Sequence, residues 1–88
     1  MPRFYFESYD NGSLTPDDVG LELATIESAR QEAIKGLADL SADVAYDERH
    51  ELAVVVLNQA RIPLFKAILV FELIDLAPAI QATNPPSE

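Results

Sequence analysis

Two apolar stretches decide the fold of this chain: Leu52-Ala53-Val54-Val55-Val56-Leu57 and Leu64-Phe65-Lys66-Ala67-Ile68-Leu69-Val70-Phe71-Glu72-Leu73-Ile74. Their β-branched residues favour extended structure, in which alternate side chains point to opposite faces. Read as a strand, the first stretch is apolar on both faces. The second has one apolar face and one that Lys66 and Glu72 interrupt.

The segment between the two stretches is short, Asn58-Gln59-Ala60-Arg61 with Pro63 just beyond it, and it contains no glycine. A connection of this length predicts that the two strands form an antiparallel hairpin. The alternative is a helix over residues 64–76, because this segment has no internal Gly or Pro and is long enough for one.

One amphipathic helix is predicted after Thr25, a residue type that caps helix N-termini, with Glu27 in the first turn. Apolar residues then recur at steps of three and four, which is the period of a helix with one buried face. This stripe consists of Ile26, Ala29, Ala33, Leu37, Leu40 and Val44. Gly36 lies inside the helix at a penalty of about 1 kcal/mol relative to Ala. It indicates either close packing against a neighbour or simple tolerance, and we favour tolerance.

The N-terminal part predicts a first strand over Phe4 to Tyr9, ending in a tight turn at Asp10-Asn11-Gly12. Pro16 and Gly20 predict that residues 13–20 form a loop or an irregular return strand. Leu21 to Leu23 is a short segment that is expected to pair at a sheet edge. Ala45 to His50 is mostly polar and is expected to be an exposed connection.

The order of these elements predicts an α+β fold: a small antiparallel sheet of three to four strands with one amphipathic helix on one face, in β-α-β-β order. The 88 residues are enough for one domain and too few for two. We expect that domain to span residues 1–76. Residues 77–88 are expected to be a C-terminal extension whose polar, proline-bearing end is mobile.

A single helix covers one face of a sheet, so the apolar residues of the other face need a different cover. Small domains bury little surface and commonly gain stability from disulfides, metals or association. This chain has no cysteine, which excludes disulfides, so association with another copy is the favoured source of additional stability. If the helix packs against Leu52, Val54, Leu69 and Phe71, the opposite face presents the remaining apolar and tyrosine side chains. The predicted interface residues are Tyr5, Tyr9, Val55, Ile68 and Val70.

No group of residues predicts a catalytic, cofactor or metal site. The lone His50 has no cysteine or Gly-x-Ser-x-Gly nucleophile to work with, and we interpret it as a solvated residue at the entry of a strand. The acidic residues Asp10, Asp17, Asp18 and Glu22 lack the spacing of a calcium loop. Six basic residues against 15 acidic ones give a net charge of -9, which disfavours nucleic acid. A local exception would need Arg3, Arg49, Arg61 and Lys66 to gather around the hairpin; scattered solubilising charge is the interpretation we favour.

Several segments together resemble a family of small bacterial domains of unknown function that begin with Met-Pro, a basic residue and an aromatic triplet. They are Met1 to Phe6, the Asp10-Asn11-Gly12 turn, Asp18 to Leu23, Glu27 to Ala33, and Pro63-Leu64-Phe65. Members commonly have His after the triplet and Asp-x-x-Gly in the last hairpin, where this chain has Glu7 and Asn58-Gln59-Ala60-Arg61. The resemblance implies the same β-α-β-β order and brings no known activity with it.

The functional expectation is therefore a non-enzymatic module that self-associates, with a dimer favoured, through its open sheet face or an edge strand. One alternative is a small-ligand binder or minor enzyme with a site between subunits, formed by Tyr5, Tyr9 and nearby carboxylates. Another is an acidic regulator that masks a basic surface, supported by the net charge. The chain shows no signal peptide and no apolar run long enough to span a bilayer, so a cytoplasmic location is expected.

Overall fold

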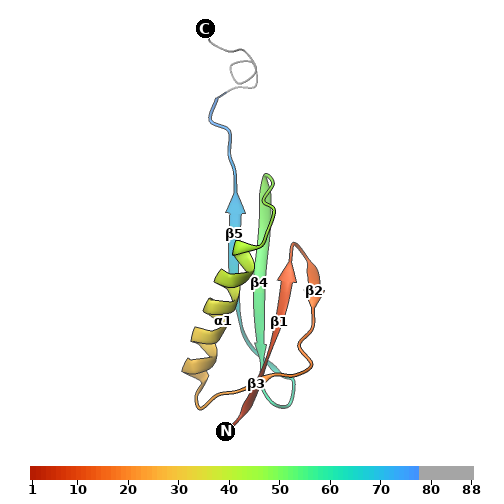
Figure 1. Ribbon diagram of the computed structural model, residues 1–88, viewed down its shortest axis with the longest axis vertical. Helices are drawn as coiled ribbons and strands as arrows, with labels where there is room; N and C mark the ends of the chain where they lie inside the picture. The colour runs from red at the N-terminus through yellow and green to blue at the C-terminus, as the bar shows by residue number, and fades with distance from the viewer. Residues whose placement is uncertain (78–88) are drawn as a thin grey trace.

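The computed structural model describes residues 1–77 and shows one helix beside an antiparallel sheet (Figure 1). The elements in chain order are β1 (Arg3–Asp10), β2 (Ser13–Thr15), β3 (Leu21–Glu22), α1 (Ile26–Ala42), β4 (Arg49–Leu57) and β5 (Pro63–Glu72). The α+β prediction is confirmed, although the sheet has five strands rather than three or four because β2 and β3 are short returns of the loop after β1.

The strands are arranged in the order β2-β1-β4-β5, and β3 pairs with β1. The predicted hairpin is confirmed: β5 runs antiparallel to β4, with Val54 opposite Ala67 and Leu52 opposite Leu69. The helix proposed as an alternative for residues 64–76 is therefore wrong. The two-residue apolar alternation and the β-branched side chains, which suit a pleated surface, decide this segment.

Two turns set the register of the sheet. Asn11 and Gly12 both have positive φ, 53° and 93°, as the tight hairpin turn between β1 and β2 requires. In the turn between β4 and β5, the Asn58 side chain accepts hydrogen bonds from the backbone N–H groups of Ala60 and Ile62, and Arg61 takes the positive φ of 67° that glycine usually supplies.

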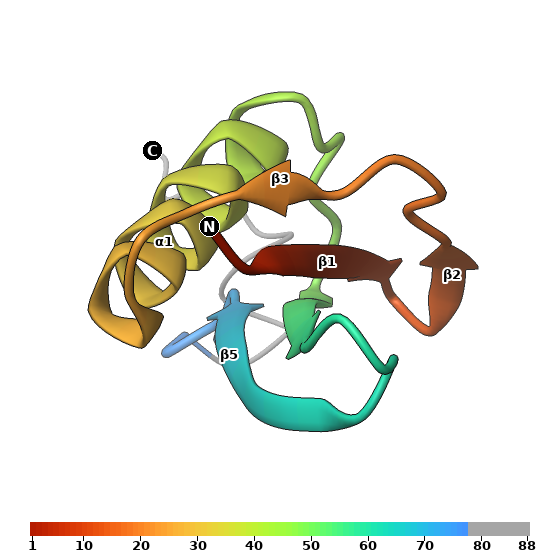
Figure 2. The same ribbon diagram turned by 90° about the horizontal axis from the view of Figure 1, so that it is seen from below.

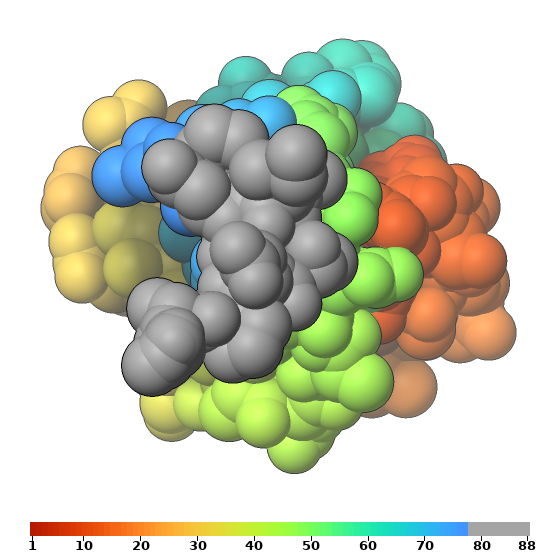
Figure 3. Space-filling view, turned by 90° about the horizontal axis from the view of Figure 1, so that it is seen from above, coloured from red at the N-terminus to blue at the C-terminus, as the bar shows by residue number. Residues whose placement is uncertain are grey.

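Helix α1 begins as predicted, because the Thr25 hydroxyl oxygen accepts a hydrogen bond from the Ser28 N–H at 3.0 Å. Figure 2 shows from the end of the molecule that α1 lies on one side of the sheet. Its apolar stripe packs against the sheet and closes the core. Seen from above, the helix surface lies on one side and the β1–β2 hairpin on the other (Figure 3). The buried core consists of Phe4, Ala29, Ala33, Leu37, Leu52, Val54 and Val56.

The ends of the elements differ from the sequence prediction. The helix ends at Ala42, so Val44 lies beyond it, although Val44 still packs against the core. Ile26, at the first helical position, is 47% exposed, so the buried part of the stripe begins at Ala29. β4 begins at Arg49, so Arg49 and His50 belong to the strand and not to the connection. The predicted C-terminal extension lies, apart from Ala77, outside the described residues.

Candidate interaction surface

All five predicted interface residues lie on the face of the sheet opposite α1. The helix packs on the face that carries Phe4, Leu52, Val54 and Val56, and strand alternation places side chains of the other parity on the far face. That face, here called the helix-free face, holds the predicted set: Tyr5, Tyr9, Val55, Ile68 and Val70. Ile68 and Val70 are 52% and 45% exposed, whereas Tyr5, Tyr9 and Val55 are half-buried.

Charges divide the helix-free face into two parts. Val55 lies opposite Glu7 on one neighbouring strand and opposite Lys66 on the other, so the three side chains form one row across the sheet. A second row, Tyr9, Ala53 and Ile68, lies beside it and is free of charge. The face is therefore not a continuous apolar surface, and its two most exposed apolar side chains lie at opposite edges: Ile68 on β5 and Leu14, which pairs with Tyr9, on β2.

At one end of the helix-free face, Tyr5 is covered by the chain itself. The Arg61 guanidinium lies over the Tyr5 ring at 3.7 Å from its centroid, and its Nη1 donates to the Asp17 carbonyl oxygen at 3.1 Å. Gly20 packs so closely that an added Cβ would lie 2.9 Å from Tyr5 Cε1. Tyr5 is thus engaged within its own chain, and its place in an interface stays a prediction.

The outer edge of β1 is closed by neighbouring segments. β3 pairs with Arg3 and Phe4, and β2 pairs with residues 8–10. In the gap between them, the Asp17 carboxylate accepts a hydrogen bond from the Phe6 N–H at 3.0 Å. A sheet edge occupied in this way offers few free backbone groups to another chain.

The Asp17 carboxylate accepts two further hydrogen bonds, from the N–H groups of Val19 and Gly20 at 3.0 Å each. Burial acts to raise its pKa, but the three backbone N–H donors and the nearby Arg61 charge outweigh burial, and the pKa of Asp17 lies below its ordinary value. The carboxylate therefore holds the loop over β1 in its ionised form.

The opposite edge of the sheet, formed by β5, is open. β5 is paired with β4 on one side, and within residues 1–77 no strand pairs with its other side (Figure 1). The Leu73 N–H donates to Glu48 O on the β4 side, and peptide groups of alternate residues point to opposite edges. The backbone N–H and C=O groups of Lys66, Ile68, Val70 and Glu72 therefore point to the open edge.

Apolar side chains are exposed on both faces of β5 and continue beyond it. Leu69 and Phe71, which share the helix-covered face, are still 40% and 36% exposed. Leu73 and Ile74 are 61% and 65% exposed in the segment that follows β5 (Figure 1). A long edge strand of this kind is a template for pairing with another chain unless charges or bulges protect it.

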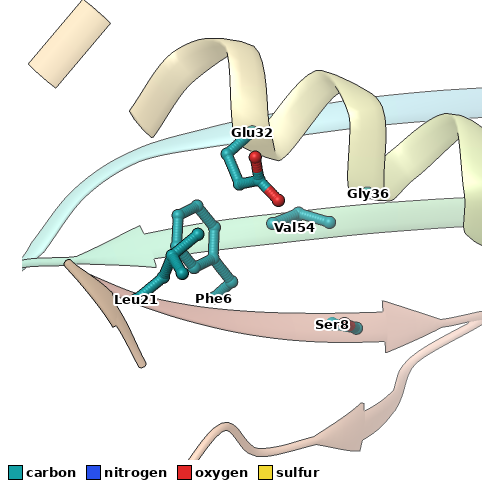
Figure 4. A pocket seen from close by; sticks show the side chains of 6 residues that line it. All are labelled: Phe6, Ser8, Leu21, Glu32, Gly36 and Val54. Carbon is teal, nitrogen blue, oxygen red and sulfur yellow. The ribbon is translucent and has the colours of Figure 1, made fainter. Parts of the chain in front are cut away.

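Two grooves flank α1 where it crosses the sheet. The groove toward β5 has a volume of about 280 Å³ and is lined by Arg30, Ala33, Ile34, Phe65, Lys66 and Ala67. The groove toward β1 has a volume of about 180 Å³ and is lined by Phe6, Ser8, Leu21, Glu32, Gly36 and Val54 (Figure 4). In the second groove the Glu32 side chain extends from α1 toward Phe6 and Val54. Neither groove gathers several polar groups around one point, as a ligand site would.

The prediction that His50 is a solvated residue is wrong. Its side chain is 13% exposed and its Nε2 pairs with Asp10 Oδ1 from the end of β1. The Tyr46 ring lies edge-on to His50 at 5.7 Å and against Phe71 at 4.5 Å, because the chain after α1 folds back over the sheet. The Tyr46 hydroxyl donates to Ser41 O, so it is directed away from the His–Asp pair.

The other candidate sites do not come together. Arg3 and Arg61 both donate to the loop beside β1, to Val19 O at 2.7 Å and Asp17 O at 3.1 Å. Arg49, paired with Glu51 at 3.6 Å, lies at the other end of β4, so the basic residues do not gather in one patch. Within residues 1–77 no group of three or more His, Cys, Asp or Glu side chains is placed to hold a metal ion. In the same part of the chain, no helix has both the length and the apolar character of a membrane span.

These features define a small α+β domain with one closed and one open sheet edge. The chain belongs to a family described as a domain of unknown function (DUF6894), whose model matches residues 3–70. The match covers the whole of the sheet except the end of β5. Comparison with curated proteins and with solved structures gives no match.

Proposed function

We propose that this protein is a non-enzymatic interaction module that self-associates, with a dimer as the favoured state, through the open edge of β5. The observation that carries the proposal is the contrast between the two sheet edges. Asp17, β2 and β3 occupy the β1 edge, whereas β5 presents free backbone groups between exposed apolar side chains. Strand addition at such an edge combines main-chain hydrogen bonds with apolar burial.

The β5 edge fits the proposal better than the centre of the helix-free face does. Glu7 and Lys66 flank Val55, and burying two charges in the middle of an interface is unfavourable unless both find partners. Ile68 and Val70 lie next to the edge and would be covered by an added strand. Of the predicted interface residues, these two are central to the proposal, and Tyr5 and Tyr9 lie across the sheet from it.

The proposed test compares Ile68→Glu with Leu14→Glu. Ile68 and Leu14 are exposed to similar extents, 52% and 49%, and lie on β5 and β2 at opposite edges of the sheet. Light scattering is expected to show that Ile68→Glu has the mass of one chain, while Leu14→Glu keeps the mass of the unmodified assembly. Thermal unfolding of each variant checks that both remain folded. The proposal fails if Ile68→Glu is folded and keeps the assembly mass.

A ligand site between subunits has less support. It would use Tyr5 and Tyr9, but the Tyr5 ring is stacked under Arg61. The proposed partner is thus a second copy of the chain, and nucleic acid is not among the proposed partners, since the net charge of -9 repels phosphate.

We also propose that the protein is bacterial and works in the cytoplasm. The location is supported by the absence of cysteine in the sequence, which suits a reducing compartment, and the origin by the family resemblance of the N-terminal motif. Fractionation of the native host, followed by detection of the protein with an antibody, tests the location. Recovery in the secreted or membrane fraction would contradict it.

A further inference from the structure

Resting on the proposed self-association, we propose that β5 pairs antiparallel with β5 of a second copy about a two-fold axis that passes through Leu69. The two sheets then join into one continuous sheet across the axis. In this register, a residue a given number of positions before Leu69 lies opposite the residue the same number of positions after Leu69 in the second copy. A two-fold interface is formed by the same surface of both subunits, and here that surface is the open edge of β5.

Charge selects this register. Lys66 and Glu72 are the two charged residues of β5, and each lies three positions from Leu69. An axis through Leu69 places Lys66 opposite Glu72 of the second copy, twice by symmetry. An axis through Lys66 or Glu72 would instead place like charges opposite each other, which is unfavourable. Any other register within β5 leaves both charges without a charged partner on the facing strand.

The backbone fits the same register. Lys66, Ile68, Val70 and Glu72 have their N–H and C=O groups directed to the open edge. In the proposed pairing, Lys66 meets Glu72 and Ile68 meets Val70, so every one of these residues faces a residue whose groups are also free. Leu69 uses its backbone groups toward β4 and lies opposite its own copy as a non-hydrogen-bonded pair, in which the Cα atoms approach to about 4.5 Å.

Side-chain sizes on the helix-covered face also match. The small Ala67 lies opposite the large Phe71 of the second copy, and Phe65 lies opposite Leu73. Phe65 and Ala67 line the groove of about 280 Å³ between α1 and β5. Phe71 and Leu73, which are 36% and 61% exposed in the single chain, would therefore lie against the groove of the second copy.

The test exchanges the two charges. Lys66→Glu alone or Glu72→Lys alone creates two like-charge pairs in the dimer and is expected to weaken dimerisation about tenfold or more. Mixing the two single variants is expected to restore a dimer, because the two acidic side chains of the Lys66→Glu chain then face the two lysines of the Glu72→Lys chain. The double variant, which carries both changes, is expected to dimerise like the unmodified chain. Light scattering measures the masses. Thermal unfolding checks each fold, since Glu72 also lies opposite Arg49 in its own chain.

A cross-link gives a second measurement. The sequence has no cysteine, so Leu69→Cys introduces a single thiol that lies opposite its own copy at a separation suited to a disulfide. Leu64→Cys is the matched control, because its two copies would lie roughly 34 Å apart along the strands. Oxidation is expected to link two copies of the Leu69→Cys variant and not two copies of the Leu64→Cys variant.

The outcomes separate the register from the proposed function. Restoration of the dimer by mixing, together with a disulfide in the Leu69→Cys variant, supports both. A dimer that survives both single charge variants, or that forms a disulfide in the Leu64→Cys variant, overturns the register and leaves self-association intact. A mass of one chain for the unmodified protein overturns the proposed function and the register with it.

Discussion

The carboxylate of Asp17 lies beside the middle of β1 and occupies the edge at which another strand could pair. Its two oxygens accept from the backbone N–H groups of Phe6, Val19 and Gly20. The sequence showed Asp17 only as one of several acidic residues without the spacing of a calcium loop. It could not show this contact, because the hydrogen bond to Phe6 joins positions 11 residues apart and depends on the path of the loop. A contact of this kind leaves no periodic or motif signal.

Asp17→Asn is expected to destabilise the fold by about 1–3 kcal/mol at pH 7, since the amide nitrogen cannot accept the hydrogen bond from Phe6. The folded-state pKa is below the unfolded value, so the carboxylate stabilises the fold above that value and this contribution is lost as the pH falls through the folded pKa. The difference between the two proteins should therefore shrink as the pH is lowered from about 5 toward 2. Urea unfolding across this range measures it. Asp18→Asn, at an exposed neighbouring position, is the control, and an equal loss in both variants would contradict the role of Asp17.

Arg61 combines a strained backbone with a favourable side-chain contact. Its φ of 67° costs about 1–2 kcal/mol for a residue other than glycine, while its guanidinium lies over Tyr5 and donates to Asp17 O. The sequence showed a turn without glycine, but it did not show which residue takes the left-handed conformation or where its side chain goes.

Two substitutions separate these effects. Arg61→Ala removes the contact with Tyr5 and keeps the strain, whereas Arg61→Gly removes both. The glycine variant is therefore expected to be more stable than the alanine variant by about 1 kcal/mol. Urea unfolding at neutral pH measures the difference. Equal stability of the two variants would show that residue 61 is free to leave the left-handed region.

At the scale of elements, no close contact in α1 requires a glycine at position 36. A Cβ at Gly36 would meet nothing within 4 Å, because this position faces the groove beside β1 (Figure 4). Close packing, one of the two sequence interpretations, is therefore excluded, and tolerance is the interpretation that remains. At Gly20 the φ is 75° and a Cβ would lie 2.9 Å from Phe4 O.

Gly36→Ala is expected to stabilise the protein by about 0.5–1 kcal/mol, because alanine has the higher helix propensity and fills open space. Gly20→Ala is expected to destabilise it by more than about 1 kcal/mol, through backbone strain and the clash with β1. Thermal and urea unfolding of this matched pair check both signs. A loss of stability in Gly36→Ala would mean that the groove is occupied in solution.

The sequence was sufficient to predict which face of the sheet each β5 side chain occupies, but not where the strands and the helix end. Alternation identified β5 and placed its side chains on the correct faces, because a period of two is unaffected by the position of strand ends. The ends of β4 and α1 were misjudged, since cross-strand pairing extends β4 to Arg49 and no residue after Ala42 marks the helix end as glycine would. The pairing of His50 with Asp10 followed from this longer strand and could not be found from sequence spacing.

At the scale of the whole molecule, the apolar residues that α1 leaves uncovered occupy a smaller part of the sheet than the sequence predicted. One helix does leave one sheet face without cover, but charges divide that face, and the exposed apolar residues concentrate along β5 and the segment after it. The sequence could indicate an excess of apolar residues. It could not show that β1 is closed by Asp17 and that β5 is open, because that asymmetry depends on the topology of the sheet.

The central claim is that the chain associates with a second copy of itself, and the most direct test is the mass of the unmodified chain in solution. Light scattering over micromolar concentrations is expected to give twice the 9.7 kDa of one chain, with a shift toward one chain on dilution. A mass of 9.7 kDa at every concentration would contradict the claim.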